Sequence, residues 1–450
     1  MKMTMKAAAA AVMAVCAASA AHAAGFMLTE QSAGALGRAY AGVGVDGTDL
    51  SGVYYNPATM TLHPGTQIQA GFVAVGLDLA FEGSGNANGV NYDGVTENGQ
   101  YNTQAIPHGY ISHQLNDSMW IGLAMTVPFG MGTEYDDNWK LSNRGISAEV
   151  LTFDFNPNLA WKVSDKLSIG AGVSIQYAAA DLKKRTDMSH PNLGRVSVDG
   201  EIDADSWAWG FNVGLMWSPL ENLRFGLSYR SQVNHHADGD LEIDNPKLNG
   251  RPVDPGMVNG VLPGVLGTYD ASASLSAPAW AMATAAWDVN ELLSLYATFR
   301  WTDWSSFEEL EIDGGTATIP VAPGVGVPVP RGDTIKNHWQ DTYLFSVGAD
   351  LRFTNWWTFR AGIGYETSVI DEESYRTAII PDADRLWLAL GSSFHATKNM
   401  QIDVSAAWLH GVGERNLWNT DGSDGQTPGK AGKFEDLDAY LFGVQLVYKF

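Results

Sequence analysis

The sequence has almost no cysteine and no long apolar segment beyond its first residues. Its single cysteine is Cys16, so a chain cleaved after residue 23 has no disulfide and no thiolate for catalysis. No run of about 18 apolar residues follows residue 23, which excludes a membrane-spanning helix there. A closed β-barrel is then the remaining structure that could cross a membrane.

Basic residues are also scarce. Lysine and arginine number 27 against 50 aspartates and glutamates, which gives a formal net charge of −23. Because nucleic acid is bound mainly through its phosphates, such an acidic chain is not expected to bind it. An anionic ligand would need a local cluster of basic residues.

Residues 1–23 have the composition of a secretory signal peptide. Lys2 and Lys6 precede a short apolar region at residues 7–18, and Ala21-His22-Ala23 supplies small residues for cleavage. We therefore expect an exported mature chain that begins at residue 24.

Residues 65–450 alternate between apolar and polar positions in segments of about ten or more residues, as in a membrane β-barrel. In residues 167–177, for example, the odd positions are apolar or aromatic and the even positions are Ser, Gly or Gln. Short turns alternate with longer polar connections. This layout predicts 14 strands, with both ends on the short-turn side.

Tryptophans cluster near the predicted strand ends, which favours a membrane barrel over a soluble β-sandwich. The inner belt would contain Trp120, Trp161, Trp217, Trp287, Trp356 and Trp357, and the outer belt Trp207, Trp209, Trp301, Trp304 and Trp408. The last strand ends on the aromatic Phe450, a feature that exported barrels present to the barrel assembly machinery.

Residues 24–64 do not alternate and are too rich in Gly and Ala to span a membrane. A 14-stranded barrel has a lumen too wide for its wall side chains to fill. We therefore expect an all-β fold, a 14-stranded antiparallel transmembrane β-barrel at residues 65–450, with residues 24–64 as an N-terminal hatch inside the lumen.

The string TVPFGMGTEY, residues 126–135, interrupts the third predicted strand, which we expect at residues 118–135. Pro128 has no N–H for the sheet, and Gly130 has no side chain to pack. Unpaired backbone groups cost several kcal/mol in a bilayer. The interruption is therefore either a bulge that adjusts the barrel shape or an opening with a function.

The string AGFMLTEQSAGALGRAY, residues 24–40, and Asn56-Pro57-Ala58 resemble the hatch of the FadL family, the outer-membrane long-chain fatty-acid transporters of Gram-negative bacteria. WGFNVGLMW, WTFRAGIGYE and PDADRLWLALG extend the resemblance through the barrel. The resemblance implies that Phe26 and Leu28 belong to the hatch. It also implies that the third strand bends inward at Pro128-Phe129-Gly130 and leaves a lateral exit in the wall.

The resemblance further implies where a fatty acid would bind. Its carboxylate would meet Lys184 or Arg185, with a second basic residue at Lys336; the alternative is that residues 183–185 form a solvated basic loop. An outer loop at residues 238–269 would capture ligand through the apolar residues Met257, Val261, Leu262 and Leu266.

The predicted function is passive uptake of long-chain fatty acids or similar hydrophobic molecules, without a cofactor. One alternative is uptake of monoaromatic hydrocarbons, the role of a branch of the same family. A lipid hydrolase is a remote alternative, because neither G-x-S-x-G nor H-E-x-x-H occurs and His235 and His236 would face opposite sides of a strand. A general porin is disfavoured by the hatch. We expect a monomer surrounded by outer-membrane lipid and lipopolysaccharide.

Overall fold

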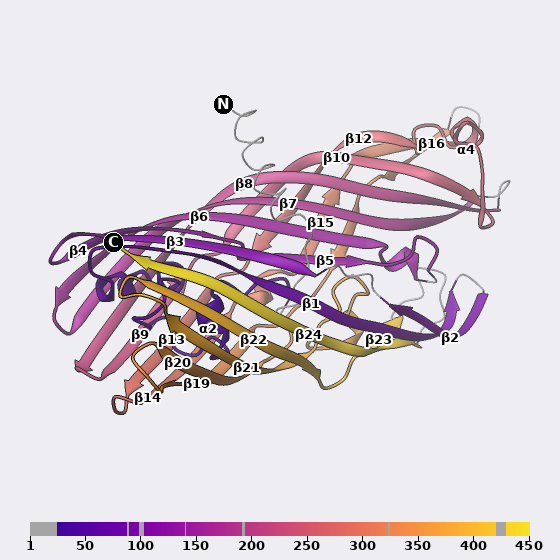
Figure 1. The fold of residues 1–450 in the computed structure, drawn as a ribbon. Coiled ribbons are helices and arrows are strands. Elements are labelled where there is room, and N and C mark those ends of the chain that lie inside the picture. The colour runs from indigo at the N-terminus through magenta and orange to yellow at the C-terminus, as the bar shows by residue number, and fades with distance from the viewer. Residues whose placement is uncertain are drawn as a thin grey trace.

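The computed structural model describes residues 25–87, 90–98, 103–139, 141–190, 194–322, 325–419 and 429–450. These residues form a closed 14-stranded antiparallel β-barrel, as predicted (Figure 1). Strand β1 (Thr66–Ala87) pairs with β24 (Gly429–Lys449), which closes the barrel. The predicted signal peptide lies outside the described residues. In the described ranges, no helix has the length and apolar character needed to span a membrane.

The wall consists of unbroken strands and of strands divided in two. The unbroken strands are β1, β3 (Gln104–Asn116), β6 (Ser147–Ser164), β7 (Leu167–His190), β8 (Gly194–Leu220), β20 (Trp357–Glu366), β21 (Asp384–His395), β22 (Met400–Val412) and β24. The divided strands are β4 (Met119–Thr126) with β5 (Gly130–Glu134), β9 (Leu223–Arg230) with β10 (Val233–Leu248), β13 (Trp280–Asp288) with β12 (Gly267–Ala277), β14 (Leu293–Thr302) with β15 (Glu309–Asp313), and β19 (Thr342–Arg352) with β18 (Asp333–Lys336).

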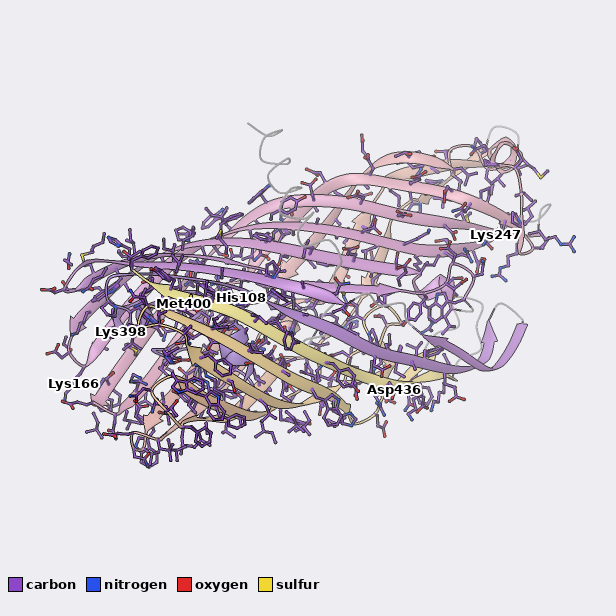
Figure 2. The ribbon with its side chains drawn as sticks, viewed as in Figure 1. His108, Lys166, Lys247, Lys398, Met400 and Asp436 are labelled. Carbon is purple, nitrogen blue, oxygen red and sulfur yellow. The ribbon has the colours of Figure 1, made fainter. Side chains whose placement is uncertain are left out.

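The short turns and the longer connections lie at opposite ends of the barrel. Figure 2 shows Lys166 and Lys398 of the short turns at one end and Lys247 toward the other. The longer connections contain β2 (Val90–Asn98), β11 (Arg251–Pro252), α4 (Pro255–Val261), β16 (Thr316–Ala322), β17 (Val325–Pro330), β23 (Asn416–Asn419) and the 3₁₀ helices Ser142–Arg144 and Glu373–Tyr375. A further 3₁₀ helix, Trp304–Ser306, lies in the break between β14 and β15.

Side chains alternate between an apolar outer face and a buried inner face, because successive residues of a strand point to opposite sides. On the outer face, Trp209 is 75% exposed, as expected for an aromatic belt residue. Trp304 is fully buried in the lumen, so its predicted place in the outer belt is wrong. The break between β14 and β15 lets the chain turn inward at this residue. Trp120 is 3% exposed and donates to the His63 carbonyl of the hatch, so its predicted place in the inner belt is also wrong.

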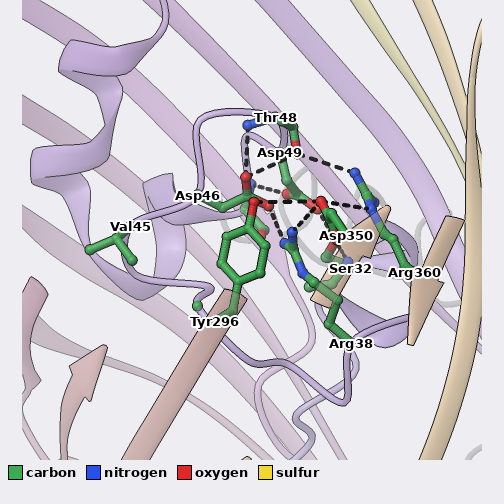
Figure 3. A network of polar contacts seen from close by, with 12 residues as sticks. Ser32, Arg38, Val45, Asp46, Thr48, Asp49, Tyr296, Asp350 and Arg360 are labelled. Carbon is green, nitrogen blue, oxygen red and sulfur yellow. Dashed lines mark hydrogen bonds and ion pairs between the residues drawn. The ribbon is translucent and has the colours of Figure 1, made fainter. Parts of the chain in front are cut away.

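The hatch fills the lumen with α2 (Ala33–Leu36), α3 (Gly52–Tyr55) and a 3₁₀ helix at Pro57–Leu62 (Figure 1). Ser32 caps α2, since its hydroxyl accepts a hydrogen bond from the Ala35 N–H at 3.0 Å. Hatch and wall are joined by buried charges, which are tolerated only when paired. Arg38 of the hatch contacts both Asp46 and the wall residue Asp350, the latter at 2.9 Å (Figure 3).

The Asn56-Pro57-Ala58 motif also fixes the hatch to the wall. The Asn56 amide donates hydrogen bonds to the Gly44 carbonyl at 2.9 Å and to the Leu215 carbonyl of β8 at 3.0 Å, while its oxygen accepts from the Ala58 N–H. A Cβ at Gly214 would lie 2.0 Å from the Asn56 side-chain oxygen, so this close approach requires glycine in the wall.

Candidate functional site

An apolar cavity lies in the lumen between the wall and Phe26 of the hatch. Ala180 and Leu182 of β7 pair with Ala204 and Ile202 of β8, and all four contribute to its lining. The remaining lining residues are Met131, Val150, Ala178, Ala179, Ser206, His235, Ala237, Ala273, Leu275, Phe307, Leu310, Ile335, Asn337, Thr377, Ile379 and Ile380. Its free volume is about 40 Å³, so an acyl chain can enter only if the hatch or lining side chains move.

A second cavity, of about 510 Å³, adjoins the first and is rich in basic residues. The two cavities share Leu182, Ile202, Ile335, Thr377 and Ile379. The basic residues of the second lining are Arg144, Lys183, Lys184, Arg185, Arg195 and Arg331, and its acidic residue is Asp187. An acidic chain thus places a basic mouth, formed by these six side chains, beside an apolar interior, an arrangement suited to an amphipathic anion. Three of the six, Lys183, Arg185 and Arg195, form ion pairs with Asp137, Asp199 and Asp187.

The predicted basic residues have different surroundings. Lys184 is two residues from Leu182, so both project from the same face of β7 into the cavity lining. Arg185 is buried and donates to both carboxylate oxygens of Asp199, at 2.7 and 2.9 Å, which neutralises its charge. Lys336 pairs through its backbone with Glu309, and its side chain lies outside the described part of the chain.

An aromatic cluster surrounds Phe26 at the inner end of the apolar cavity. The Phe26 ring lies 4.7 Å from Trp304, 5.5 Å from Phe307, and 5.9 Å from both Phe129 and Trp339 between ring centroids. Phe26 thus stands between the cavity and the interrupted strand. Sequence analysis did not identify Phe307 or Trp339, because their inward position depends on the breaks in β14/β15 and β18/β19.

The third strand is interrupted, since β4 ends at Thr126 and β5 begins at Gly130. The start of the hatch pairs with this interruption as a short strand would. The Leu28 N–H donates to the Pro128 carbonyl, and the Gly130 N–H donates to the Phe26 carbonyl, each at 2.8 Å. The hatch therefore replaces part of the pairing that the strand loses.

Side chains satisfy other backbone groups of the interruption. Gln31 donates to the Val127 carbonyl at 2.6 Å and accepts from the Val127 N–H at 3.3 Å. The Thr152 hydroxyl accepts from the Phe129 N–H at 2.9 Å and donates to the Phe129 carbonyl at 2.8 Å. Gln31 and Thr152 were not identified from the sequence. The backbone groups of Val127 and Phe129 face the hatch and lumen, where irregular backbone is tolerated in a membrane protein.

The wall lacks backbone pairing beside the interruption. Strand β3 pairs with β1 from Gln104 to His113, but it pairs with β4 only from Gly109 onward. Strand β5 pairs with β6 and, within the described ranges, not with β3. The first residues of β3 therefore form a local strand edge. Pro107 lies in this segment, and proline is typical of edges.

The predicted capture loop includes α4 and reaches the basic cavity. Met257 is 53% exposed, whereas Leu262 and Leu266 are buried and Val261 is partly buried. The Arg331 guanidinium stacks on the Tyr269 ring at 3.7 Å and donates to the Gly264 carbonyl. These contacts hold the loop against the cavity mouth.

A family model described as outer membrane protein transport protein (OMPP1/FadL/TodX) matches residues 14–450. The long-chain fatty acid transport protein of Escherichia coli O6:H1 is 27% identical over 95% of this chain and 94% of its own. The crystal structure of a Pseudomonas aeruginosa FadL homologue is 25% identical over 95% of this chain and 100% of its own, with a TM-score of 0.82. The toluene transporter TodX of P. putida, 17% identical, covers 93% of this chain and 99% of its own with a TM-score of 0.64, and thus shares the fold.

Proposed function

The chain belongs to the outer membrane protein transport family (OMPP1/FadL/TodX), and from this premise we propose that it is a passive uptake channel for long-chain fatty acids. Its location is the outer membrane of a Gram-negative bacterium. Ligand is captured at the outer loops, enters the apolar cavity, and leaves sideways through the wall beside the interrupted strand.

The paired cavities support an amphipathic ligand. Lys184 lies on the same face of β7 as the apolar Leu182, so a carboxylate beside Lys184 places its acyl chain among the alanines and leucines of the inner cavity. A charge-assisted hydrogen bond to lysine stabilises the carboxylate there. The basic mouth favours a carboxylate over an uncharged hydrocarbon.

Lateral exit follows from the energetics of the acyl chain. At about 0.8 kcal/mol per CH₂, a sixteen-carbon chain prefers hydrocarbon to water by roughly 12 kcal/mol. Passage through the wall into the bilayer keeps this energy, whereas release into periplasmic water loses it. Phe26 and Leu28 occupy the path and must move for the ligand to pass.

The proposal is carried by one observation: in the part of the chain that the structure describes, β3 and β5 do not pair, and the strand interruption beside them is covered by the hatch. Deletion of the gene tests the function. We expect slower growth on oleate as sole carbon source and unchanged growth on toluene. Loss of growth on toluene alone would instead support uptake of monoaromatic hydrocarbons.

The Lys184→Ala variant tests the headgroup site. We expect about tenfold weaker binding of a long-chain fatty acid, because one charge-assisted hydrogen bond is lost. Binding is measured with the purified protein in detergent, and Lys166→Ala, in a short turn at the opposite end, is the control. Equal affinities of wild type and Lys184→Ala would remove Lys184 from the site.

A further inference from the structure

The apolar cavity contains polar groups that a plain hydrocarbon chain does not satisfy. Asn337 is 1% exposed and lines the cavity, yet its side-chain oxygen has no hydrogen-bond partner among the described residues. A buried acceptor left unpaired is destabilising, because it has lost its hydrogen bonds to water without replacement. A ligand that donates a hydrogen bond to Asn337 removes this cost.

The unpaired side-chain oxygen of Asn337 lies partway along the cavity. Ile335 lines both cavities and therefore marks the boundary with the basic mouth. Trp339 contacts Phe26 at the inner end. Asn337 lies between them in the chain, about 7 Å beyond Ile335 at the rise of an extended chain. The ligand atom that meets Asn337 is thus inside the chain, away from the carboxylate.

The Ser206 hydroxyl is a second hydrogen-bond acceptor in the cavity. Ser206 and His235 both line it, and the Ser206 hydroxyl lies 2.9 Å from Nδ1 of His235. Nε2 of His235 lies 3.0 Å from the side-chain oxygen of Gln176, which only accepts, so Nε2 carries the proton. Nδ1 then accepts from Ser206, whose oxygen is left with its lone pairs. Asn337 and Ser206 both offer acceptors.

We propose that the cavity selects acyl chains that carry a hydroxyl group in the interior of the chain, bound by Asn337 and supported by Ser206. This inference rests on the proposed function, because it names the class of fatty acid that the same cavity takes. Both acceptors are fixed in a lining that is otherwise mainly apolar, so the hydroxyl contributes selectivity as well as affinity.

The test compares the binding of hexadecanoic acid with that of its mid-chain hydroxy derivative to the purified full-length protein in detergent, by displacement of a fluorescent fatty acid. We expect wild type to bind the hydroxy acid about tenfold more tightly, the size of one satisfied buried acceptor. Moving the hydroxyl next to the carboxylate or to the methyl end should remove this gain.

The Asn337→Leu variant keeps the side-chain size and removes the acceptor, so it should bind the two acids equally. Ser206→Ala should lower the preference and serves in place of Asn337→Leu if that variant does not fold. Ser112→Ala, which removes another buried hydroxyl without a partner in the described residues but outside the cavity lining, should keep the full preference.

The outcomes separate this inference from the function. Equal binding of both acids by wild type would overturn the hydroxyl preference and leave fatty-acid uptake standing. An unchanged preference in both Asn337→Leu and Ser206→Ala would overturn the assigned residues. Binding of neither acid would contradict the proposed function itself.

Discussion

At the scale of single residues, the start of the hatch combines an amide clamp with a buried carboxyl group. Gln31 holds the backbone of Val127, and its neighbour Glu30 is 1% exposed. Burial raises the pKa of Glu30 to about 7, and nearby Glu366 adds to this rise, while Arg385 and Arg300 oppose it. Glu30 therefore changes charge near neutral pH, next to the residue that holds the interrupted strand.

We predict that docking of the hatch start weakens as pH rises from about 4.5 to 7. The ordinary pKa of the Glu30 carboxyl is 4.5, so between that value and about 7 the docked state holds a proton that the undocked state has lost. Stability therefore falls with rising pH across this window, by up to roughly 3 kcal/mol.

Hydrogen exchange of residues 26–31 at several pH values measures this effect. After correction for the intrinsic exchange rate, protection should decrease with pH in wild type and stay nearly constant in Glu30→Gln. The same pH dependence in both proteins would show that another group is responsible.

At the scale of elements, the interrupted third strand could be predicted from the sequence because Pro128 and Gly130 break the local pattern. The edge of β3 could also have been suspected from Pro107. The lumen position of Trp304 could not be predicted from the sequence, since a tryptophan near a strand end has the same periodicity whether it faces lipid or lumen. Its inward turn depends on contacts with Phe26, which is far away in sequence.

The same limit applies to the candidate site. Lys184 was identified through a family resemblance, but the basic mouth also includes Arg144, Arg195 and Arg331 from separate segments. Only strand register and loop folding bring these residues together. The lone acceptor of Asn337 is likewise a property of packing, and no spacing pattern reveals it.

We predict that Pro128→Thr combined with Gly130→Val impairs uptake and leaves assembly intact. Threonine restores an N–H, and a Cβ at Gly130 would lie 3.0 Å from Cδ1 of Leu28, so the hatch start is displaced and the strand can pair more regularly. Transport of a radiolabelled fatty acid should fall severalfold, while heat-modifiable migration on gels stays normal.

Gly76→Val in β1 is the matched control for this double variant, because the nearest atom to an added Cβ there is 3.8 Å away. Its uptake should equal that of wild type. Normal uptake by the double variant would count against exit beside the third strand.

At the scale of the whole molecule, buried ion pairs decide how firmly the hatch is held. Arg38 joins hatch residue Asp46 to wall residue Asp350, which Arg360 of the wall also contacts (Figure 3). Arg360 also reaches Asp403. Arg38 and Asp46 lie in the middle of the hatch sequence, whereas the pairing with Pro128 involves its start. The start of the hatch is thus held by backbone pairing and its middle by charge.

We predict that Arg38→Met destabilises the hatch by about 3–5 kcal/mol, because two carboxylates are left buried without this partner. The loss of hatch stability is measured by urea titration, with protease cleavage within residues 25–64 as the readout. Lys433→Met, which removes the exposed ion pair with Glu435, should cost less than about 1 kcal/mol. Similar losses in both variants would contradict a buried network that holds the hatch.

The seam between β1 and β24 also constrains biogenesis. The hatch leads directly into β1, and β1 pairs with β24 along the seam that closes the barrel. Once these two strands have joined, some forty residues could enter the interior only by threading through a finished ring. The hatch must therefore already lie on the concave side of the sheet before β1 and β24 pair, so the barrel closes around a hatch that is already in place.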